Sequence, residues 1–374
     1  MENFKSGVYL SQGTFKSFIP NEINRSWELK DPEIQSLLSK ADRQLGRLDM
    51  YSEYIPNIDL FIRMHVLKEA TQSSKIEGTK TNIEDVLQEK EDLVEDKRDD
   101  WEEVQNYISA LNHAIDSLTE LPLSSRLIKK AHSVLLQGVR GKSKLPGEFR
   151  TSQNWIGGAT ITDATFIPPP HKDVPRLMGD LEKFGHNQEV FFPDLLKIAL
   201  IHYQFETIHP FLDGNGRVGR LLITLYLVEK GILKKPILYL SDFFERNRGL
   251  YYDNLMKVRT ENDIKQWFKF FLVGVTETAK NSINTFDQIL KLQKEVDEKI
   301  QNLGSRATNA RLVINNLFRH PLTNAQQVTK LTGQSPPTAY KIISVLEELK
   351  ILKEFTGAKR GKQYLFQDYL ALFK

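Results

Sequence analysis

Apolar residues recur at helical spacing along most of the chain, and this pattern predicts a mainly α protein. A helix over residues 58–78 carries Leu60, Met64 and Leu67 on one face, and Gly78 is placed to end it. A further helix should begin at Ser124 or Ser125, both of which are good N-cap residues. The same spacing predicts the remaining helices within residues 34–50, 84–118, 174–187, 193–209, 220–231 and 264–300.

The segment 149–170 departs from the helical pattern. Short β-prone runs stand on either side of Gly157-Gly158, which predicts a hairpin. Pro168-Pro169-Pro170 should then continue it as extended chain.

The chain changes character again at Gly304-Ser305. Three short helical patterns follow, and then two β-prone runs joined by a basic turn. That order predicts a winged helix-turn-helix. We therefore expect three parts: an N-terminal extension over residues 1–57, a helical core over residues 58–303, and a winged-helix unit over residues 304–374.

Composition narrows the class of protein. Hydrophobic residues make up 40% and charged residues 26% of the chain, which is typical of a folded globular protein. The absence of cysteine excludes disulfides and thiolate metal sites and fits a reducing cytoplasm. The first residues lack the apolar core of a secretory signal, and charges interrupt every apolar stretch short of a membrane span. We expect a soluble cytoplasmic protein with no membrane contact.

The run from His209 to Arg220 carries the candidate chemistry. One helix pattern ends just before it and another begins at about Gly216, so a tight loop feeds a helix N-terminus, which is an anion-binding geometry. Glycines allow close approach of backbone to phosphate. Arg217 and Arg220 lie on one helix face and can reach the same polyphosphate. Asp213 suits a Mg²⁺ ion bridging two phosphates, and His209 is the candidate general base.

Taken singly, these residues have ordinary explanations, since Gly and Asn are common at helix junctions and a lone histidine is often a buried core residue. A base, a carboxylate, two glycines and two arginines within twelve positions favour a nucleotide site instead. The run is not a P-loop, because Arg217-Val218 stands where that motif needs a Lys-Ser/Thr pair.

At every defined position this run resembles the Fic motif, HxFx(D/E)GNGRxxR. The resemblance extends over a helical core at roughly residues 58–290 and a C-terminal winged helix found in many longer members. It implies a Fic-type helical core with a β-hairpin flap. It also implies AMPylation, the transfer of AMP from ATP to a Ser, Thr or Tyr hydroxyl of a protein.

The resemblance assigns roles by position. His209 would deprotonate the hydroxyl, Asp213 would hold Mg²⁺, and Arg220 would orient the γ-phosphate. The implied ATP-binding residues are Gly214, Asn215, Gly216, Arg217, Val218, Gly219 and Arg220. Gly216 stands where the phosphorylating Doc branch has Lys, which favours AMP transfer, while phosphocholine transfer stays open.

Upstream, residues 73–78 resemble the family's inhibitory motif (S/T)xxxE(G/N). A carboxylate from Glu77 that paired with Arg220 would remove the donor that the γ-phosphate needs. Ser73, one helical turn earlier, is expected to hydrogen-bond to the loop. The chain is therefore expected to be inhibited by Glu77 at rest.

Two further regions take roles from the resemblance. The hairpin residues Trp155, Ile156, Gly157 and Phe166 match the flap that docks a target segment by strand addition. Tyr252 and Asn247 are candidates for the adenosine pocket, although tyrosines on a helix are more often core residues.

Alternative functions remain open from the sequence. Lys341, Lys359, Arg360 and Lys362 place positive charge on the expected winged helix, which makes a DNA-binding regulator a second hypothesis. Removal of AMP from proteins is a third, because the same residues would serve both directions. The expected protein target includes the chain itself, and a homodimer is a further expectation.

Overall fold

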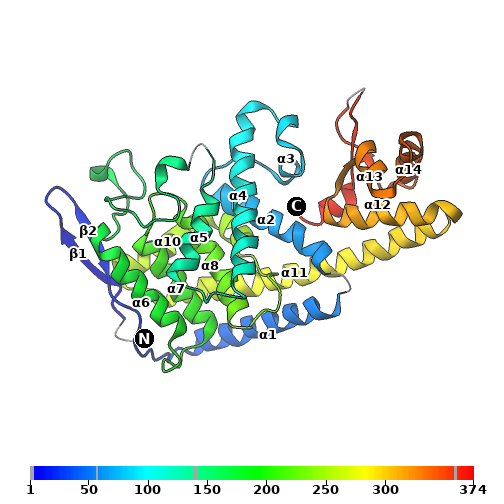
Figure 1. The fold of residues 1–374 in the computed structure, drawn as a ribbon. Helices are drawn as coiled ribbons and strands as arrows, with labels where there is room; N and C mark the ends of the chain where they lie inside the picture. Colours follow the sequence, from blue (N-terminus) through cyan, green and yellow to red (C-terminus); the bar gives the residue numbers. More distant parts are fainter. Residues whose placement is uncertain (1–3, 56–57, 139–140, 358–359) are drawn as a thin grey trace.

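The computed structural model describes residues 4–55, 58–138, 141–357 and 360–374, and helices dominate it (Figure 1). The mainly α class predicted from the hydrophobic pattern is confirmed. The helices before residue 304 are α1 (Pro32–Tyr54), α2 (Asp59–Ile76), α3 (Ile83–Leu87), α4 (Glu95–Ser117), α5 (Ser125–Leu135), α6 (Val174–His186), α7 (Asp194–Ile208), α8 (Asn215–Glu229), α9 (Ser241–Arg246), α10 (Arg248–Glu261) and α11 (Ile264–Gln301). Within the described ranges, no helix is long and apolar enough to cross a membrane.

Helix ends follow the local chemistry of the sequence. Ser124 caps α5, and its hydroxyl accepts a hydrogen bond from the backbone N–H of Leu127 at 3.4 Å. Gly78, with φ of 106°, turns the chain away after α2. Gly214, with φ of 75°, precedes the first residue of α8. The predicted ends of these three helices are therefore confirmed.

Helix α7 forms the centre of the core. Every residue from Leu195 to Ile208 is buried, as expected for a helix with neighbours on all sides. It packs against α6, α8 and α11, while α1 and α11 run side by side along the edge of the molecule (Figure 1). The C-terminal end of α7 and the N-terminal end of α8, which residues 209–214 connect, are thus held in place by the packed apolar core.

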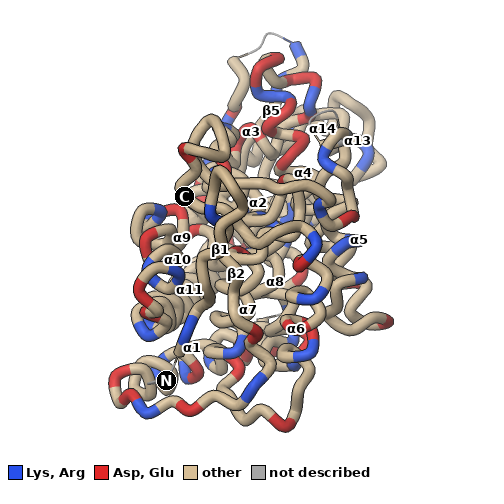
Figure 2. Tube along the Cα trace, turned by 90° about the vertical axis from the view of Figure 1, so that its left-hand side faces the viewer, with Lys and Arg blue, Asp and Glu red and all other residues tan. Residues whose placement is uncertain are grey.

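An N-terminal hairpin was not predicted from the sequence. Strands β1 (Gly7–Ser11) and β2 (Lys16–Pro20) pair antiparallel, and the backbone N–H of Phe18 donates to the carbonyl of Ile167 at 2.9 Å. The tube of this hairpin is almost entirely tan in Figure 2, because Lys16 is the one charged residue among residues 7–20. The bond from Phe18 to Ile167 joins this hairpin to the segment predicted as a flap.

The flap itself differs from the predicted hairpin. Ile156 and Phe166 form one isolated antiparallel bridge, with no regular strand between them. Gly157 and Gly158 have φ of 70° and 74°, so the extended chain ends at once after Ile156. A short 3-10 turn (Ile161–Asp163) follows. The predicted hairpin is therefore present as a single antiparallel bridge, because two left-handed glycines end the extended chain directly after Ile156.

The C-terminal segment contains α12 (Ala307–Arg319), β3 (Leu322–Asn324), α13 (Ala325–Thr332), α14 (Pro336–Glu348), β4 (Lys353–Glu354), β5 (Gln363–Leu365) and α15 (Gln367–Ala371). The three strands form one antiparallel sheet in the order β3-β5-β4. Strand β3 and helix α15 are additional to the predicted elements, and Lys359 lies outside the described residues. The assignment to the winged-helix class and the boundary at residue 304 stay predictions.

This C-terminal segment packs on α2. The ring of Phe318 meets Phe61 edge-on at 5.7 Å, and Phe373 meets His65 at 5.1 Å. Lys374 forms an ion pair with Glu84 just beyond α2. One face of α2 is therefore covered by residues from the far end of the chain (Figure 1).

Candidate functional site

The loop between α7 and α8 adopts the tight geometry expected for an anion site. His209 ends α7 in the left-handed conformation, with φ of 50°. The side-chain amide of Asn215 closes the loop on the backbone of Phe211, accepting from its N–H at 2.8 Å and donating to its carbonyl at 2.9 Å. These two bonds fold the side-chain amide back onto the loop, and the role of Asn215 in ATP binding stays a prediction. The free donors are backbone N–H groups at the start of α8.

His209 sits in an electropositive, largely enclosed position. Burial lowers its pKa to about 3, and the positive charges of Arg259 and Arg150 act in the same direction. The imidazole is therefore neutral at physiological pH and able to accept a proton. Arriving phosphates would raise this pKa, because nearby negative charge favours the imidazolium.

Arg150 is a buried anchor for His209 that sequence reasoning missed. Its guanidinium donates to the carbonyls of His209 at 2.9 Å, Ser152 at 3.1 Å and Pro169 at 2.5 Å. Asn154 adds a bond from its amide to the carbonyl of Phe211 at 2.9 Å. These contacts join the loop to the base of the flap. No sequence signal marked them, since a lone arginine in a β-prone run is ordinarily exposed.

His132 on α5 supports the same loop from the other side. Its ring stacks on Phe211 with 3.7 Å between the centroids. Its Nδ1 accepts from the N–H of Gly147 at 2.9 Å, so the proton lies on Nε2, which donates to the carbonyl of Asp213 at 3.0 Å. This residue was also missed, because a histidine within an amphipathic helix carries no signal of its own.

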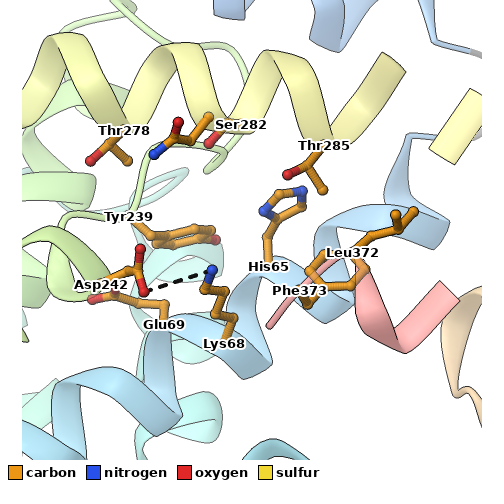
Figure 3. A pocket seen from close by; sticks show the side chains of 11 residues that line it. His65, Lys68, Glu69, Tyr239, Asp242, Thr278, Ser282, Thr285, Leu372 and Phe373 are labelled. Carbon is orange, nitrogen blue, oxygen red and sulfur yellow. Dashed lines mark ion pairs between the residues drawn. The ribbon is translucent and has the colours of Figure 1, made fainter. Parts of the chain in front are cut away.

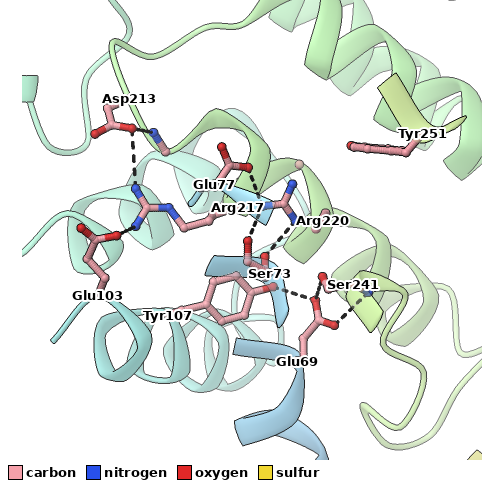
Figure 4. Close-up of polar contacts among 12 residues, drawn as sticks. Glu69, Ser73, Glu77, Glu103, Tyr107, Asp213, Arg217, Arg220, Ser241 and Tyr251 are labelled. Atoms are coloured by element: carbon pink, nitrogen blue, oxygen red, sulfur yellow. Dashed lines mark hydrogen bonds and ion pairs between the residues drawn. The ribbon is translucent and has the colours of Figure 1, made fainter. Parts of the chain in front are cut away.

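Glu77, Ser73 and Arg220 meet as the inhibitory motif predicts (Figure 4). The Nη2 of Arg220 donates to Oε1 of Glu77 at 2.7 Å and to the carbonyl of Ser73 at 2.8 Å. Its Nε donates to the hydroxyl of Ser73 at 2.9 Å. Burial alone would lower the pKa of Arg220, but the charge of Glu77 raises it above the ordinary value. Ser73 was expected to bond the loop and instead bonds Arg220 on α8, because α2 runs beside α8.

Arg217 is also paired with a carboxylate (Figure 4). Its Nη1 donates to Oε2 of Glu103 on α4 at 3.1 Å, and its Nη2 lies 3.6 Å from Oδ1 of Asp213. Glu103 lies within the helix predicted over residues 84–118, and the sequence predicted no function for it. Both arginines of the motif are thus held by carboxylates from helices that precede it in the chain.

Asp213 presents its carboxylate at the mouth of the loop. The side chain is 46% exposed, and Oδ1 accepts from the N–H of Gly214 at 2.6 Å. The described residues contain no cluster of three or more His, Cys, Asp or Glu side chains placed to hold a metal. A single carboxylate suits Mg²⁺ that arrives with its own phosphates, since this ion is ordinarily held by one or two carboxylates plus substrate oxygens.

A cavity of about 510 Å³ opens between the flap, α10 and the motif. The predicted residues that line it are Glu77, Trp155, Ile156, Gly157, Phe166, His209, Gly216, Arg220 and Tyr252. Its volume falls in the range of small-molecule sites. Tyr251, Leu255 and Met256 add an aromatic and apolar wall that the sequence did not indicate.

Other predicted residues lie apart from this cavity. Val218 is 1% exposed and its side chain packs in the core, so its assignment to ATP binding stays a prediction. Gly219 faces Glu206, whose Oε1 would lie 2.2 Å from a Cβ at that position. The amide of Asn247 bonds to the carbonyl of Phe243 on the preceding turn, and Asn247 does not line the cavity.

A smaller cavity of about 50 Å³ lies between α2, α11 and the C-terminal residues Leu372 and Phe373 (Figure 3). It shares no lining residue with the larger one, and its wall includes His65, Lys68, Glu69, Tyr239 and Phe373. Such a volume holds a few water molecules and is too small for a nucleotide. Glu69, on the wall of this smaller cavity, accepts hydrogen bonds from Tyr107 and Ser241 (Figure 4).

The chain is similar to proteins of one family. The model of the Fic/DOC family N-terminal region matches residues 35–116, and the model of the Fic/DOC family matches residues 122–227. A probable protein adenylyltransferase of Aquifex aeolicus is 28% identical over 218 residues, which are 56% of this chain and 59% of that protein. The protein adenylyltransferase Fic of Aedes aegypti is 35% identical over 125 residues, which are 33% of this chain and 22% of that protein.

Solved structures share the fold. A Fic family protein from Desulfovibrio desulfuricans aligns with a TM-score of 0.58 and 20% identity, covering 91% of this chain and 98% of that one. Residues 134–508 of Fic-1 from C. elegans align with a TM-score of 0.53 and 18% identity, covering 68% and 74%. The two matched regions take in the helix that carries Ser73 and the whole loop from His209 to Arg220, and the chain therefore belongs to the Fic/DOC family.

Proposed function

We propose that the protein transfers AMP from ATP to a Ser, Thr or Tyr hydroxyl of a protein. The observation that carries this proposal is the convergence of His209, Arg220 and the N-terminus of α8 on one cavity large enough for a nucleotide. The printed names of the Aquifex and Aedes relatives, both adenylyltransferases, support it.

The chemistry follows from these positions. The hydroxyl oxygen attacks the α-phosphorus and forms a new P–O bond, while the bond from the α-phosphorus to the bridging oxygen breaks and pyrophosphate leaves. His209 takes the hydroxyl proton, for which its neutral imidazole is prepared. The backbone N–H groups at the start of α8 stabilise negative charge on the phosphate oxygens, and Arg220 fixes the γ-phosphate.

Asp213 is the residue that would hold Mg²⁺ accompanying ATP. When bound, this ion would neutralise phosphate charge. Asp213 would first exchange its contact with Arg217 for the ion, which frees one nitrogen of that arginine to face the phosphates.

Glu77 is proposed as an internal inhibitor. Its carboxylate holds the guanidinium that the γ-phosphate requires, at 2.7 Å, and Arg220 is only 3% exposed. ATP binding would therefore have to displace a nearly buried ion pair, which costs more than displacing an exposed one. In this resting form ATP would bind without alignment of its α-phosphorus for attack.

The flap and α10 would complete the substrate sites. Trp155 and Ile156 border the cavity, so a target segment pairing with their backbone would bring its hydroxyl toward His209. Tyr252, which also borders the cavity, would contact the adenosine.

The test is incubation of the purified protein with Mg²⁺ and ATP labelled at the α-phosphate, followed by mass mapping. We expect Glu77→Gly to label protein much faster than the wild type, and His209→Ala in that background to abolish labelling. Equal labelling by Glu77→Gly and wild type would remove the inhibitory role. Transfer of label from the γ-phosphate instead would show phosphorylation and contradict the proposal.

The other partners named from the sequence remain proposals. Binding of DNA by the C-terminal segment is tested by a gel shift with random duplex at stated salt, because phosphate contacts depend steeply on ionic strength. Removal of AMP is tested by supplying an AMPylated protein to wild type and to Glu77→Gly. Self-association is tested by sedimentation, and a cytoplasmic location by fractionation of cells.

A further inference from the structure

Glu206 is a buried carboxyl group inside the candidate active site that the proposed reaction has not used. It lies on α7 one turn before His209, is 6% exposed, and lines the large cavity. Its Oε1 has no hydrogen-bond partner among the described residues. A buried oxygen of this kind is costly, so its position calls for a partner that is absent from the resting arrangement.

Two carboxylates, those of Glu77 and Glu206, lie against the glycines at the start of α8. A Cβ on Gly216 would lie 2.2 Å from Oε1 of Glu77 and 2.9 Å from Nη1 of Arg220. A Cβ on Gly219 would lie 2.2 Å from Oε1 of Glu206. Positions three apart on a helix are neighbours about 5–6 Å apart, so the two carboxylates lie against neighbouring positions of α8, and Arg220 interacts electrostatically with both.

The charge balance links the two carboxylates. Burial raises the pKa of Glu206 to about 7, Arg220 lowers it, Glu77 raises it and Arg259 lowers it. When Glu77 withdraws, a repulsive charge is lost and Glu206 ionises more readily. Arg220, which is 3% exposed, then needs a new anion, because an unpaired buried charge is strongly destabilising.

We propose that Glu206 is a positioning residue that holds Arg220 toward the γ-phosphate of ATP after Glu77 has left. This inference rests on the proposed function and extends it to the released state. One edge of the Arg220 guanidinium would bond Glu206, and the other edge would remain for the phosphate. The bond to Glu206 would thus fix the orientation of the guanidinium. The titratable and charged groups that face Glu206 from neighbouring elements are Glu77, His209, Arg220, Tyr251, Tyr252 and Arg259.

The experiment compares variants of the full chain in the Glu77→Gly background. Binding of ATP and of ADP, each with Mg²⁺, is measured by calorimetry for Glu206→Gln, for Glu206→Asp and for the control Glu182→Gln. Glu182 accepts a hydrogen bond from Ser125 and does not line the large cavity. We expect Glu206→Gln to weaken ATP about tenfold and to leave ADP within twofold, because ADP has no γ-phosphate to misalign. Glu206→Asp should fall between the parent and Gln.

Kinetics give a second readout. In the Glu77→Gly parent, kcat/KM for ATP should fall as the pH is lowered through the pKa of Glu206, and Glu206→Gln should lack this decline. The loss in the Gln variant should lie mainly in KM.

Equal weakening of ATP and ADP would show a merely structural role and overturn the inference, as would unchanged ATP binding. If the Gln variant does not fold, the same comparison is made on the Asp variant: weaker binding of ATP than of ADP would support the positioning role of Glu206, and equal changes would overturn it. A Glu77→Gly parent that binds ATP but transfers nothing would contradict the proposed function, while the binding comparison still decides the role of Glu206.

Discussion

Arg150→Met keeps most of the buried volume of the arginine and removes its N–H donors. The carbonyls of His209, Ser152 and Pro169 lose a donor at 2.5 to 3.1 Å, and the carbonyl of Ile208 loses a longer bond of 3.4 Å. His209 keeps a longer contact from Asn154, at 3.3 Å, whereas the carbonyl of Pro169 becomes a buried acceptor that the guanidinium no longer satisfies. The substitution is therefore expected to loosen both His209, the proposed general base, and the flap.

The expected loss of stability is the difference between the lost hydrogen bonds and the relieved cost of burying the guanidinium charge. Hydrogen bonds from a charged donor contribute about 1.5–3 kcal/mol each, so the three shorter bonds together contribute about 4.5–9 kcal/mol. Burial lowers the pKa of Arg150 from 12.5 to about 10, and at 1.36 kcal/mol per pKa unit the variant recovers about 3 kcal/mol of that cost. We expect the free energy of unfolding to fall by about 3 kcal/mol.

Urea unfolding at pH 7 measures this loss, with Arg176→Met as the matched control. Arg176 is 51% exposed and pairs with Glu22, so its loss should cost less than about 1 kcal/mol. Transfer in the Glu77→Gly background should also fall at least about tenfold, since misplacing a catalytic base by 1 Å is worth a hundredfold. An Arg150→Met protein as stable as the control would refute the assignment of Arg150 as the anchor of the loop.

Three further outcomes are expected. Glu103→Gln should tighten ATP binding severalfold by calorimetry, because its carboxylate competes with phosphate for Arg217; weaker binding would show that Glu103 instead orients that arginine. Burial lowers the pKa of His65 and of His202 to about 3, below the 6.5 of the free imidazole, so the unfolded chain takes up protons that the folded chain does not as the pH falls below 6.5. The free energy of unfolding should then decline by about 1.4 kcal/mol per pH unit for each histidine, measured by urea titrations at pH 7 and 5, and a flat profile would contradict their burial as neutral rings. Gly157→Ala should lower labelling of protein without changing ATP affinity, because a Cβ at φ of 70° is strained and would meet Thr165; equal labelling would separate the flap from target docking.

The residues that could be predicted from the sequence are those with a local pattern. Helix α2, the loop at Gly214 and the pairing of Glu77 with Arg220 follow from spacing and from the two motifs. The supporting residues could not be found in this way. Arg150 bonds to residues 58 and 59 positions away, and Glu103 meets Arg217 across 114 positions. Such contacts depend on how helices pack, which local periodicity does not encode.

The departures from these expectations also have physical causes. Two glycines in the left-handed region made the flap a single bridge where β-propensity indicated strands. Asn215 is among the residues that the family resemblance assigns to ATP binding, and in the structure its side-chain amide makes two hydrogen bonds with the backbone of Phe211. A short polar side chain beside a tight turn ordinarily bonds its own backbone first.

The packing of Phe318 and Phe373 against α2 bears on how the protein can be dissected. A truncated form ending near residue 303 would leave Phe61 and His65 uncovered on the very helix whose other end carries Ser73. Exposing that apolar face would let α2 shift or fray, and the ion pair at Arg220 would weaken with it. High activity of a shortened protein would then report damage to its inhibitor, and a bulky tag fused after Lys374, beside Glu84, could produce the same false gain.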